Sequence, residues 1–160
     1  MNARQKPQLD EPRFVDGLEM IIAGQNIRYD FETRVNIPTQ WARFAPQIGK
    51  VPGQVGNNSY GVSWNYDGKE FDYLCGVEVS DTSGLPENFE HVRLAPRRYA
   101  VFTHHGDVST LPDMIQRIWA EWLPASGHKA AQAPCFERYT EEFCPDTGTG
   151  GMEIWIPIQS

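Results

Sequence analysis

Apolar and polar residues alternate along several stretches of the chain, as is typical of half-buried β-strands. The alternation predicts six strands, three in each half of the chain: 19–29, 59–64, 71–79, 97–103, 136–139 and 152–158. Gly24 interrupts the first strand and indicates a bulge or a bend there. Asp67 and Gly68 predict a tight hairpin turn between the second and third strands.

Two other stretches show the spacing of an amphipathic helix. The first predicts a short helix over 38–48, with apolar residues on one face: Trp41, Phe44, Ala45 and Ile48. The second predicts a longer helix over 109–123, with a wider apolar face: Leu111, Met114, Ile115, Ile118, Trp119 and Trp122. Pro124 is expected to end this helix, because proline lacks the N–H that a continuing helix needs.

The order strand, helix, strand, strand therefore occurs twice. We predict an α+β fold made of duplicated β-α-β-β modules, with pseudo-repeats at about 12–80 and 88–160 inside a single domain of residues 12–160. Residues 1–11 are polar and are predicted to be a flexible N-terminus. Each module exposes an apolar sheet face and must pack on the other, so the seam between them is the expected place for a pocket.

Composition excludes several classes of protein. A chain of 160 residues with 40% hydrophobic residues can bury one domain core. The formal net charge of -7, without a basic stripe, argues against direct nucleic-acid binding. Without an export signal or a run of about 18 apolar residues, the sequence predicts no membrane contact. The three cysteines show no CxxC spacing, which favours a cytoplasmic protein without disulfides.

No residue pattern predicts catalysis, a metal or a cofactor. His104 and His105 are adjacent on a strand, so their side chains point to opposite faces and cannot both bind one ion. They are expected to be hydrogen-bonded locally. Cys135 and Cys144 lack a neighbouring base, and GxSxG, HExxH and P-loop motifs are missing from the sequence.

The second half nevertheless resembles a known family. The resemblance is carried by three segments: Tyr99 to Gly106 (YAVFTHHG), Pro134 to Tyr139 (PCFERY) and Glu153 to Ile158 (EIWIPI). They are similar to the GyrI-like small-molecule-binding domain, the effector-binding domain of AraC-type and multidrug-responsive transcription activators. The resemblance implies an antiparallel sheet flanked by helices, with a ligand groove between the modules. Such activators carry a preceding helix-turn-helix module, and the sequence shows none, so a free-standing module is expected.

The resemblance also implies a ligand-binding glutamate. The family commonly has a buried glutamate in a Phe-Glu-x-Tyr context, which falls on Glu137 and Tyr139. A carboxylate placed among apolar residues loses hydration, and its pKa rises. An arriving cation would relieve that cost, and nearby aromatic faces would add up to about 2 kcal/mol per well-placed ring.

Aromatic residues are abundant, with five Trp, six Tyr and eight Phe. Those on the proposed seam are candidate ligand contacts: Tyr60, Trp64, Tyr66, Phe71, Trp119, Trp122 and Phe136. Tyr73 lies on the same predicted strand as Phe71 and belongs to the seam, but it is not selected as a contact. Any single ring is typical of core packing, so the hypothesis concerns the set. Glu70 follows an Asp-Gly turn, as a solvated edge residue would, but would be a second anionic anchor if directed inward. Glu78 and Glu153 alternate with apolar residues and are expected to be exposed.

These observations favour a non-enzymatic module that binds hydrophobic, cationic small molecules for drug sensing or sequestration, linked to transcription through a partner. Two alternatives stay open. One is a protein-interaction inhibitor of the gyrase-inhibitor type, whose partner would be a topoisomerase rather than a DNA-binding regulator. The other is a hydrolase of small hydrophobic electrophiles, with Glu137 or Glu70 as general base.

Overall fold

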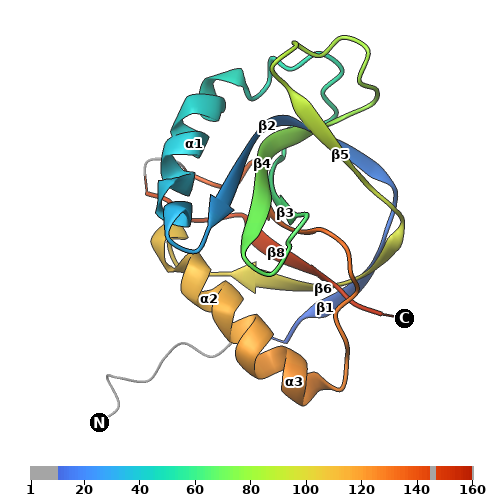
Figure 1. Ribbon diagram of the computed structural model, residues 1–160, viewed down its shortest axis with the longest axis vertical. Helices are drawn as coiled ribbons and strands as arrows, with labels where there is room; N and C mark the ends of the chain where they lie inside the picture. The colour runs from blue at the N-terminus through green and yellow to red at the C-terminus, as the bar shows by residue number, and fades with distance from the viewer. Residues whose placement is uncertain (1–10, 145–146, 160) are drawn as a thin grey trace.

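Eight strands form a single antiparallel sheet, and the helices lie on one of its faces (Figure 1). The computed structural model describes residues 11–144 and 147–159, so the expected flexible segment 1–11 lies almost wholly outside the described residues. The strands are β1 (Arg13–Gly17), β2 (Met20–Asp30), β3 (Ser59–Trp64), β4 (Glu70–Val79), β5 (Glu90–Leu94), β6 (Arg97–His104), β7 (Cys135–Tyr139) and β8 (Met152–Pro157). The predicted α+β class and all six predicted strands are confirmed.

The sheet has the strand order β1-β6-β8-β7-β3-β4-β2-β5. Its two central strands, β3 and β7, come from different halves of the chain and pair with each other. The short strands β1 and β5 were not predicted, and each pairs with the other half of the chain: β1 with β6, and β5 with β2. The duplicated modules thus exchange their leading strands.

These two pairings share one register. Gly17 lies opposite Arg97, and Met20 lies opposite Leu94, so the residue numbers of antiparallel partners keep the same sum across the corner from β1 to β2. Residues 13–24 and 90–101 therefore form one long bent ribbon. The ribbon contains both edge strands, β1 and β5, and so connects the two edges of the sheet. The sheet is strongly curved, and its concave side is called the inner face (Figure 1).

Gly24 marks a close approach of two backbones rather than a bulge. The pairing of β2 with β4 is unbroken from Ile21 to Asp30, with Gly24 opposite Gly76. A Cβ atom on Gly24 would lie 1.8 Å from the carbonyl oxygen of Cys75. Of the predicted bulge or bend, the bulge is therefore wrong, and glycine is required because a side chain would collide with the neighbouring strand.

Helix α1 (Ile37–Phe44) follows the 3-10 turn η2 (Thr33–Asn36) and continues into η3 (Ala45–Gln47), close to the predicted 38–48. The second predicted helix is a composite that does not end before Pro124: η4 (Val108–Thr110), α2 (Leu111–Arg117), the π turn η5 (Ile118–Trp122) and α3 (Leu123–Ser126). The Leu123 N–H donates to the Ile118 carbonyl, five residues back. A proline ring has room after this widened turn, and the helix ends instead at Gly127.

In the described part of the chain, no helix is long and apolar enough to cross a membrane.

The two faces of the sheet bury different cores. The inner face packs ten buried residues against one another, Leu74 and Phe136 among them. On the outer face, α1 packs through Phe44 on β2 and β4, whereas the α2 and η5 segments pack through Leu111 and Ile118 on β6 and β8. Each fully buried large apolar side chain contributes about 1.5–3 kcal/mol, so both cores hold the modules together.

Candidate ligand-binding site

Glu137 lies in the middle of the sheet, where the two halves meet. It stands on β7 opposite Gly61 of β3, and its side chain is directed to the helix-covered face. The residue is 8% exposed, although it carries a carboxyl group. The predicted seam between the modules therefore contains the predicted glutamate.

Aromatic hydroxyl and indole groups surround this carboxyl group. The Tyr73 hydroxyl donates to Glu137 Oε1 at 2.8 Å, and the Tyr139 hydroxyl donates to the same oxygen at 3.3 Å. The indole N–H of Trp41, on α1, donates to the Tyr73 hydroxyl at 3.0 Å. The Trp41 ring stands edge-on to the Tyr139 ring, with centroids 5.2 Å apart. We call Glu137, Tyr73, Tyr139 and Trp41 the Glu137 site.

Gly61 makes the room for this arrangement. A Cβ atom at Gly61 would lie 2.0 Å from the Tyr73 hydroxyl oxygen and 3.0 Å from Glu137 Oε1. Any side chain there would push the hydroxyl away from the carboxyl group. The hydrogen bond across β3 thus depends on a glycine in the central strand.

Burial raises the pKa of Glu137 to about 7, although the hydrogen bonds from Tyr73 and Tyr139 oppose the rise. Burial, followed by the Glu137 charge, raises the pKa values of both tyrosines well above their ordinary value. Burial, followed by the same charge, raises the pKa of Cys135 to about 12 and also raises that of Cys75. Among the residues that the structure describes, no Lys, Arg or His forms an ion pair with Glu137.

The carboxyl group is largely covered in this conformation, since Glu137 is only 8% exposed. A surface hollow of about 650 Å³ lies at the His104 end of β6, and one of about 390 Å³ lies beside α1 near Arg43. Glu137 lines neither hollow. A ligand that reaches the carboxyl group must therefore displace part of the covering layer, in which Trp41 is half-buried.

Three of the predicted ligand contacts lie on the opposite face of the sheet from Glu137. Phe136 and Tyr60 pack together on the inner face with ring centroids 5.8 Å apart. Trp64 packs against the same inner cluster, and its indole N–H donates to Asn26 Oδ1 at 3.1 Å. The structure does not bring these three rings together with Glu137, because the sheet itself lies between them.

Three others lie where β3 turns into β4. Tyr66 is 60% exposed, and Phe71 is half-buried on the helix-covered face. Glu70 is exposed and forms an ion pair with Arg28 at 3.3 Å. Phe71 therefore lies at one end of the helix-covered face, whereas alternation along β4 places Glu70 on the opposite face, so Glu70 is not a second carboxylate beside Glu137.

The two helix tryptophans are also apart from Glu137. Trp119 is 36% exposed on the π turn. Trp122 is half-buried and packs edge-on against Phe102 at 5.0 Å. Of the aromatic candidates, Tyr139 alone hydrogen-bonds Glu137 among the residues described.

Sequence reasoning placed Tyr73 on the seam without selecting it as a ligand contact, and it missed Trp41 and Gly61 as members or supports of the site. Alternation along β4 does place Tyr73 on the face that Phe71 and Cys75 share. Which strand lies beside β4, and in what register, is a long-range property that alternation does not contain. A strand glycine that admits a neighbouring hydroxyl is the signal that could have indicated the contact.

Glu153, on the neighbouring strand β8, has a different environment from the one expected. It was predicted to be exposed, but its side chain is only 15% exposed. It accepts hydrogen bonds from Arg13 at 2.7 Å, from Arg138 at 2.8 Å and from the Trp155 indole at 3.1 Å. The prediction is wrong because Glu153 points to the inner face, where Arg13, Arg138 and Trp155 cover its carboxylate and bind it.

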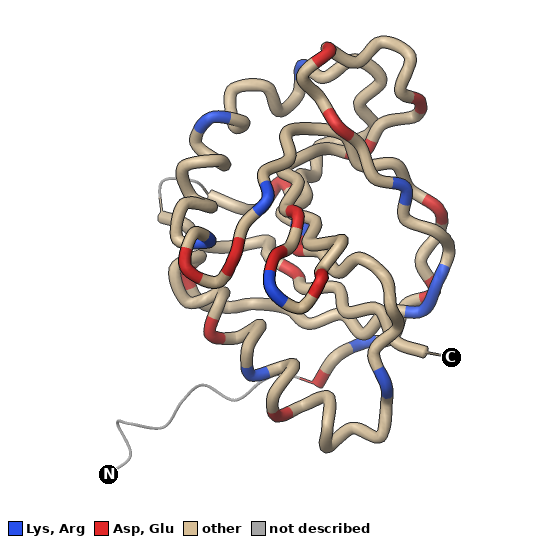
Figure 2. Tube along the Cα trace, viewed as in Figure 1, with Lys and Arg blue, Asp and Glu red and all other residues tan. Residues whose placement is uncertain are grey.

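The histidine pair and the charged residues suggest no separate chemistry. The His104 ring nitrogens contact Met114 and Thr110 at 2.9 and 3.0 Å. Within residues 11–144 and 147–159, no group of three or more His, Cys, Asp or Glu is placed to hold a metal ion. Figure 2 shows Lys and Arg scattered among acidic residues over the traced chain.

Comparison with known proteins identifies the family of the chain. Its sequence matches the GyrI-like small molecule binding domain over residues 10–159. It is 29% identical to the transcriptional regulator BrlR of Pseudomonas aeruginosa PAO1 over 120 residues, 74% of this chain and 44% of that protein. It is 33% identical to the probable transcriptional regulator YgiV of Escherichia coli O157:H7 over 93 residues, 52% of this chain and 56% of that protein. The alignments span about half the length of each regulator.

The fold is shared more widely than the sequence. The structure of SAV2435 bound to tetraphenylphosphonium superposes with a TM-score of 0.75 at 18% identity, covering 94% of this chain and 95% of that one. This likeness concerns the fold, and the match over residues 10–159 concerns the sequence. The chain belongs to the GyrI-like small-molecule-binding domain family, whose members include transcriptional regulators.

Proposed function

We propose that the chain is a binding module for lipophilic cations, with Glu137 as counter-charge and the rings of Trp41, Tyr73 and Tyr139 as walls. The observation that supports this is the state of Glu137. Its carboxyl group is 8% exposed, and its hydrogen-bond donors are uncharged hydroxyl groups. A buried carboxylate without a cationic partner is unfavourable by several kcal/mol, and a bound cation removes that cost.

The aromatic groups determine which cations fit. Rings attract a cation through their faces without a fixed hydrogen-bond geometry, so they favour a diffuse organic charge over a small hydrated ion. The relative SAV2435 was solved with tetraphenylphosphonium, a cation of this class. The protein would act as a binder and not as a catalyst, with Glu137 neutralising the ligand rather than attacking it.

Titration with tetraphenylphosphonium tests the proposal. We expect tryptophan fluorescence at pH 8 to report binding, and Glu137→Gln to weaken it at least about tenfold, or ~1.4 kcal/mol. Glu153→Gln removes the same charge from the other face of the sheet and should leave the affinity within about twofold, since its carboxylate already has arginine partners.

A neutral ligand gives the complementary control. Triphenylphosphine oxide carries three similar rings without a net charge, so its affinity should not fall in Glu137→Gln. Equal affinities of the wild type and Glu137→Gln for tetraphenylphosphonium would remove the proposed counter-charge.

A further inference from the structure

Three aromatic rings lie close together where β2 ends and where β3 turns into β4. The rings of Phe31 and Tyr66 are 6.2 Å apart, and the Phe31 ring is 6.4 Å from Phe71. Phe31 is 54% exposed and Tyr66 60% exposed. Adjacent exposed rings on a folded domain are typical of a binding surface. We call Phe31, Tyr66 and Phe71 the outer aromatic cluster.

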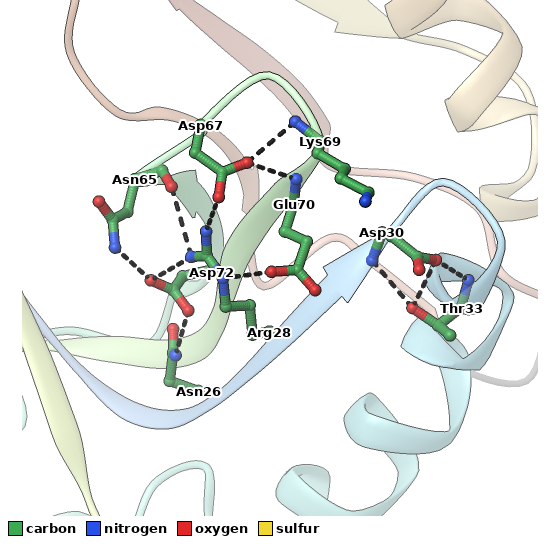
Figure 3. A network of polar contacts seen from close by, with 9 residues as sticks. All are labelled: Asn26, Arg28, Asp30, Thr33, Asn65, Asp67, Lys69, Glu70 and Asp72. Atoms are coloured by element: carbon green, nitrogen blue, oxygen red, sulfur yellow. Dashed lines mark hydrogen bonds and ion pairs between the residues drawn. The ribbon is translucent and has the colours of Figure 1, made fainter.

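The turn that carries Phe31 is fixed by a carboxylate. Asp30 Oδ1 accepts hydrogen bonds from the backbone N–H groups of Glu32 at 2.8 Å and Thr33 at 2.7 Å. The Thr33 hydroxyl donates to the same oxygen at 3.0 Å (Figure 3). This capped turn holds Phe31 outward, so its exposure does not come from a loose loop.

The hairpin that carries Tyr66 is fixed in the same way. Asp67 Oδ1 accepts from the backbone N–H groups of Lys69 at 2.9 Å and Glu70 at 2.7 Å. Arg28 on β2 then ties the hairpin to the neighbouring strand, because its guanidinium donates to Asp67 Oδ2 at 2.8 Å (Figure 3). The hydrogen bonds of the two turns thus fix the positions of the exposed Phe31 and Tyr66 rings relative to each other before any ligand binds.

The charges around the rings favour a cation. Arg28 is met by Asp67, Glu70 and Asp72, with three carboxylates facing one guanidinium (Figure 3). Glu70 and Asp72 lie on the face of β4 opposite Phe71, but acidic residues still outnumber basic ones by five to three at this end of the sheet: Asp30, Glu32, Asp67, Glu70 and Asp72 against Arg28, Arg34 and Lys69. The guanidinium carbon of Arg34 lies 5.1 Å from the Phe31 ring centroid, so this ring face already holds a cation of the chain itself. Rings plus excess negative charge suit a lipophilic cation.

The outer aromatic cluster also borders the Glu137 site. Phe71 stands two residues before Tyr73 on β4, and both side chains lie on the helix-covered face. The Tyr73 hydroxyl donates to Glu137. A path along one face of one strand therefore leads from the exposed rings to the buried carboxyl group.

We propose that the outer aromatic cluster is a first binding site, where a lipophilic cation is held before it enters the Glu137 site. The inference rests on the proposed function and adds an entry site to it. Phe31 and Tyr66 hold the cation at the surface, and Arg34 competes with it for the Phe31 face.

Stopped-flow fluorescence with tetraphenylphosphonium tests the entry site. The observed rate should rise with ligand concentration and level off, and its half-saturation concentration measures the first site. We expect a Phe31→Ser and Tyr66→Ser double variant to raise that concentration about five- to tenfold. Phe14 offers a matched control, because it is 40% exposed and lies under Arg98 at 5.6 Å, and Phe14→Ser should leave it unchanged.

The competing arginine gives a change in the opposite direction. Arg34→Gln frees the Phe31 face and should lower the half-saturation concentration about two- to threefold. Arg98→Gln removes an equal charge above Phe14 and should have no such effect. An equal change in both variants would indicate general electrostatic attraction and would overturn the entry site.

Ligand-induced NMR shifts separate this inference from the proposed function. In Glu137→Gln, tetraphenylphosphonium should still shift the ring signals of Phe31 and Tyr66, because the outer site does not need the carboxylate.

If the affinity depends on Glu137 but the Phe31→Ser and Tyr66→Ser double variant keeps wild-type kinetics, the entry site is wrong and the proposed function stands. If Glu137→Gln binds as the wild type does, the proposed role of Glu137 as counter-charge is wrong. The ligand-induced shifts of the Phe31 and Tyr66 rings then still test whether the entry site exists. Ring signals that move with protein concentration instead of ligand would assign the cluster to contacts between copies and overturn the proposal.

Discussion

Glu137 and Glu153 stand on neighbouring strands of one sheet but on opposite faces. Glu137 on β7 faces the helices and accepts hydrogen bonds from two tyrosine hydroxyls. Glu153 on β8 faces the inner side and is bonded by two arginines and an indole N–H. Burial acts on both carboxyl groups. It raises the pKa of Glu137 to about 7, whereas the partners of Glu153 outweigh burial and lower its pKa.

The contrast shows that burial alone does not decide in which direction the pKa of a carboxyl group moves. Glu153 has its counter-charges within the fold, and Arg138 also lies over the Trp155 ring at 5.0 Å. A further cation would gain little there. Glu137 has hydrogen-bond donors but no counter-charge among the described residues, so the fold stabilises its ionised form less than that of Glu153.

The largest expected effect concerns the stability of the protein without ligand. The folded-state pKa of Glu137, about 7, lies above its ordinary value of 4.5, so the folded protein holds the proton more tightly than the unfolded chain does. Glu137 therefore lowers stability as the pH rises from 4.5 through 7, by about 3 kcal/mol in total. We expect Glu137→Gln to unfold in urea with a free energy about 3 kcal/mol above that of the wild type at pH 8, and close to it at pH 4.5.

The matching change on the next strand should have the opposite sign. Glu153→Gln leaves Arg138 half-buried without its charge partner and should lower the free energy of unfolding by about 2 kcal/mol at pH 7. The pKa of Glu153 is lowered by folding, so its contribution is present above about pH 4.5 and is lost as the pH falls through the folded value. Urea unfolding at pH 7 and pH 3 measures both points. A deficit that grows on acidification would contradict the pairing.

The smallest expected effect concerns how ligand affinity depends on pH. Tetraphenylphosphonium keeps its charge at every pH, so only the ionised fraction of Glu137 changes. With a pKa of about 7, that fraction is roughly tenfold lower at pH 6 than at pH 8, and the Kd should rise about tenfold on the same interval. Calorimetry at the two pH values tests this, with Glu137→Gln as a variant expected to show no dependence. A constant Kd in the wild type would place the relevant charge elsewhere.

Part of the candidate site could be predicted from residues close together in the sequence. The resemblance of the second half to the family indicated Glu137 and Tyr139, and both belong to the site. The same strand also showed that Phe136 was a poor candidate, because alternation places it on the opposite face from its neighbour Glu137. Applying period two to each candidate would have removed Phe136 from the set.

Other members of the site are separated in the sequence by up to about a hundred residues. Trp41 and Tyr73 meet Glu137 only because α1 lies over β4 and because β3, with Gly61, lies between β4 and β7. Helical spacing identified Trp41 as part of an apolar face, but it does not say what that face covers. Strand order and register are set by packing between distant segments.

The sequence by itself determined six of the eight strands, the positions of the helices, the duplicated strand, helix, strand, strand order and the family. These follow from local periodicity and from short motifs, which a single stretch of chain contains. Only the tertiary structure decided that the leading strands exchange partners, that Glu153 has two arginine partners and that no arginine pairs with Glu137 within residues 11–144 and 147–159. The physical reason is that the state of a buried charge depends on which distant side chains surround it, and that is fixed when the sheet closes.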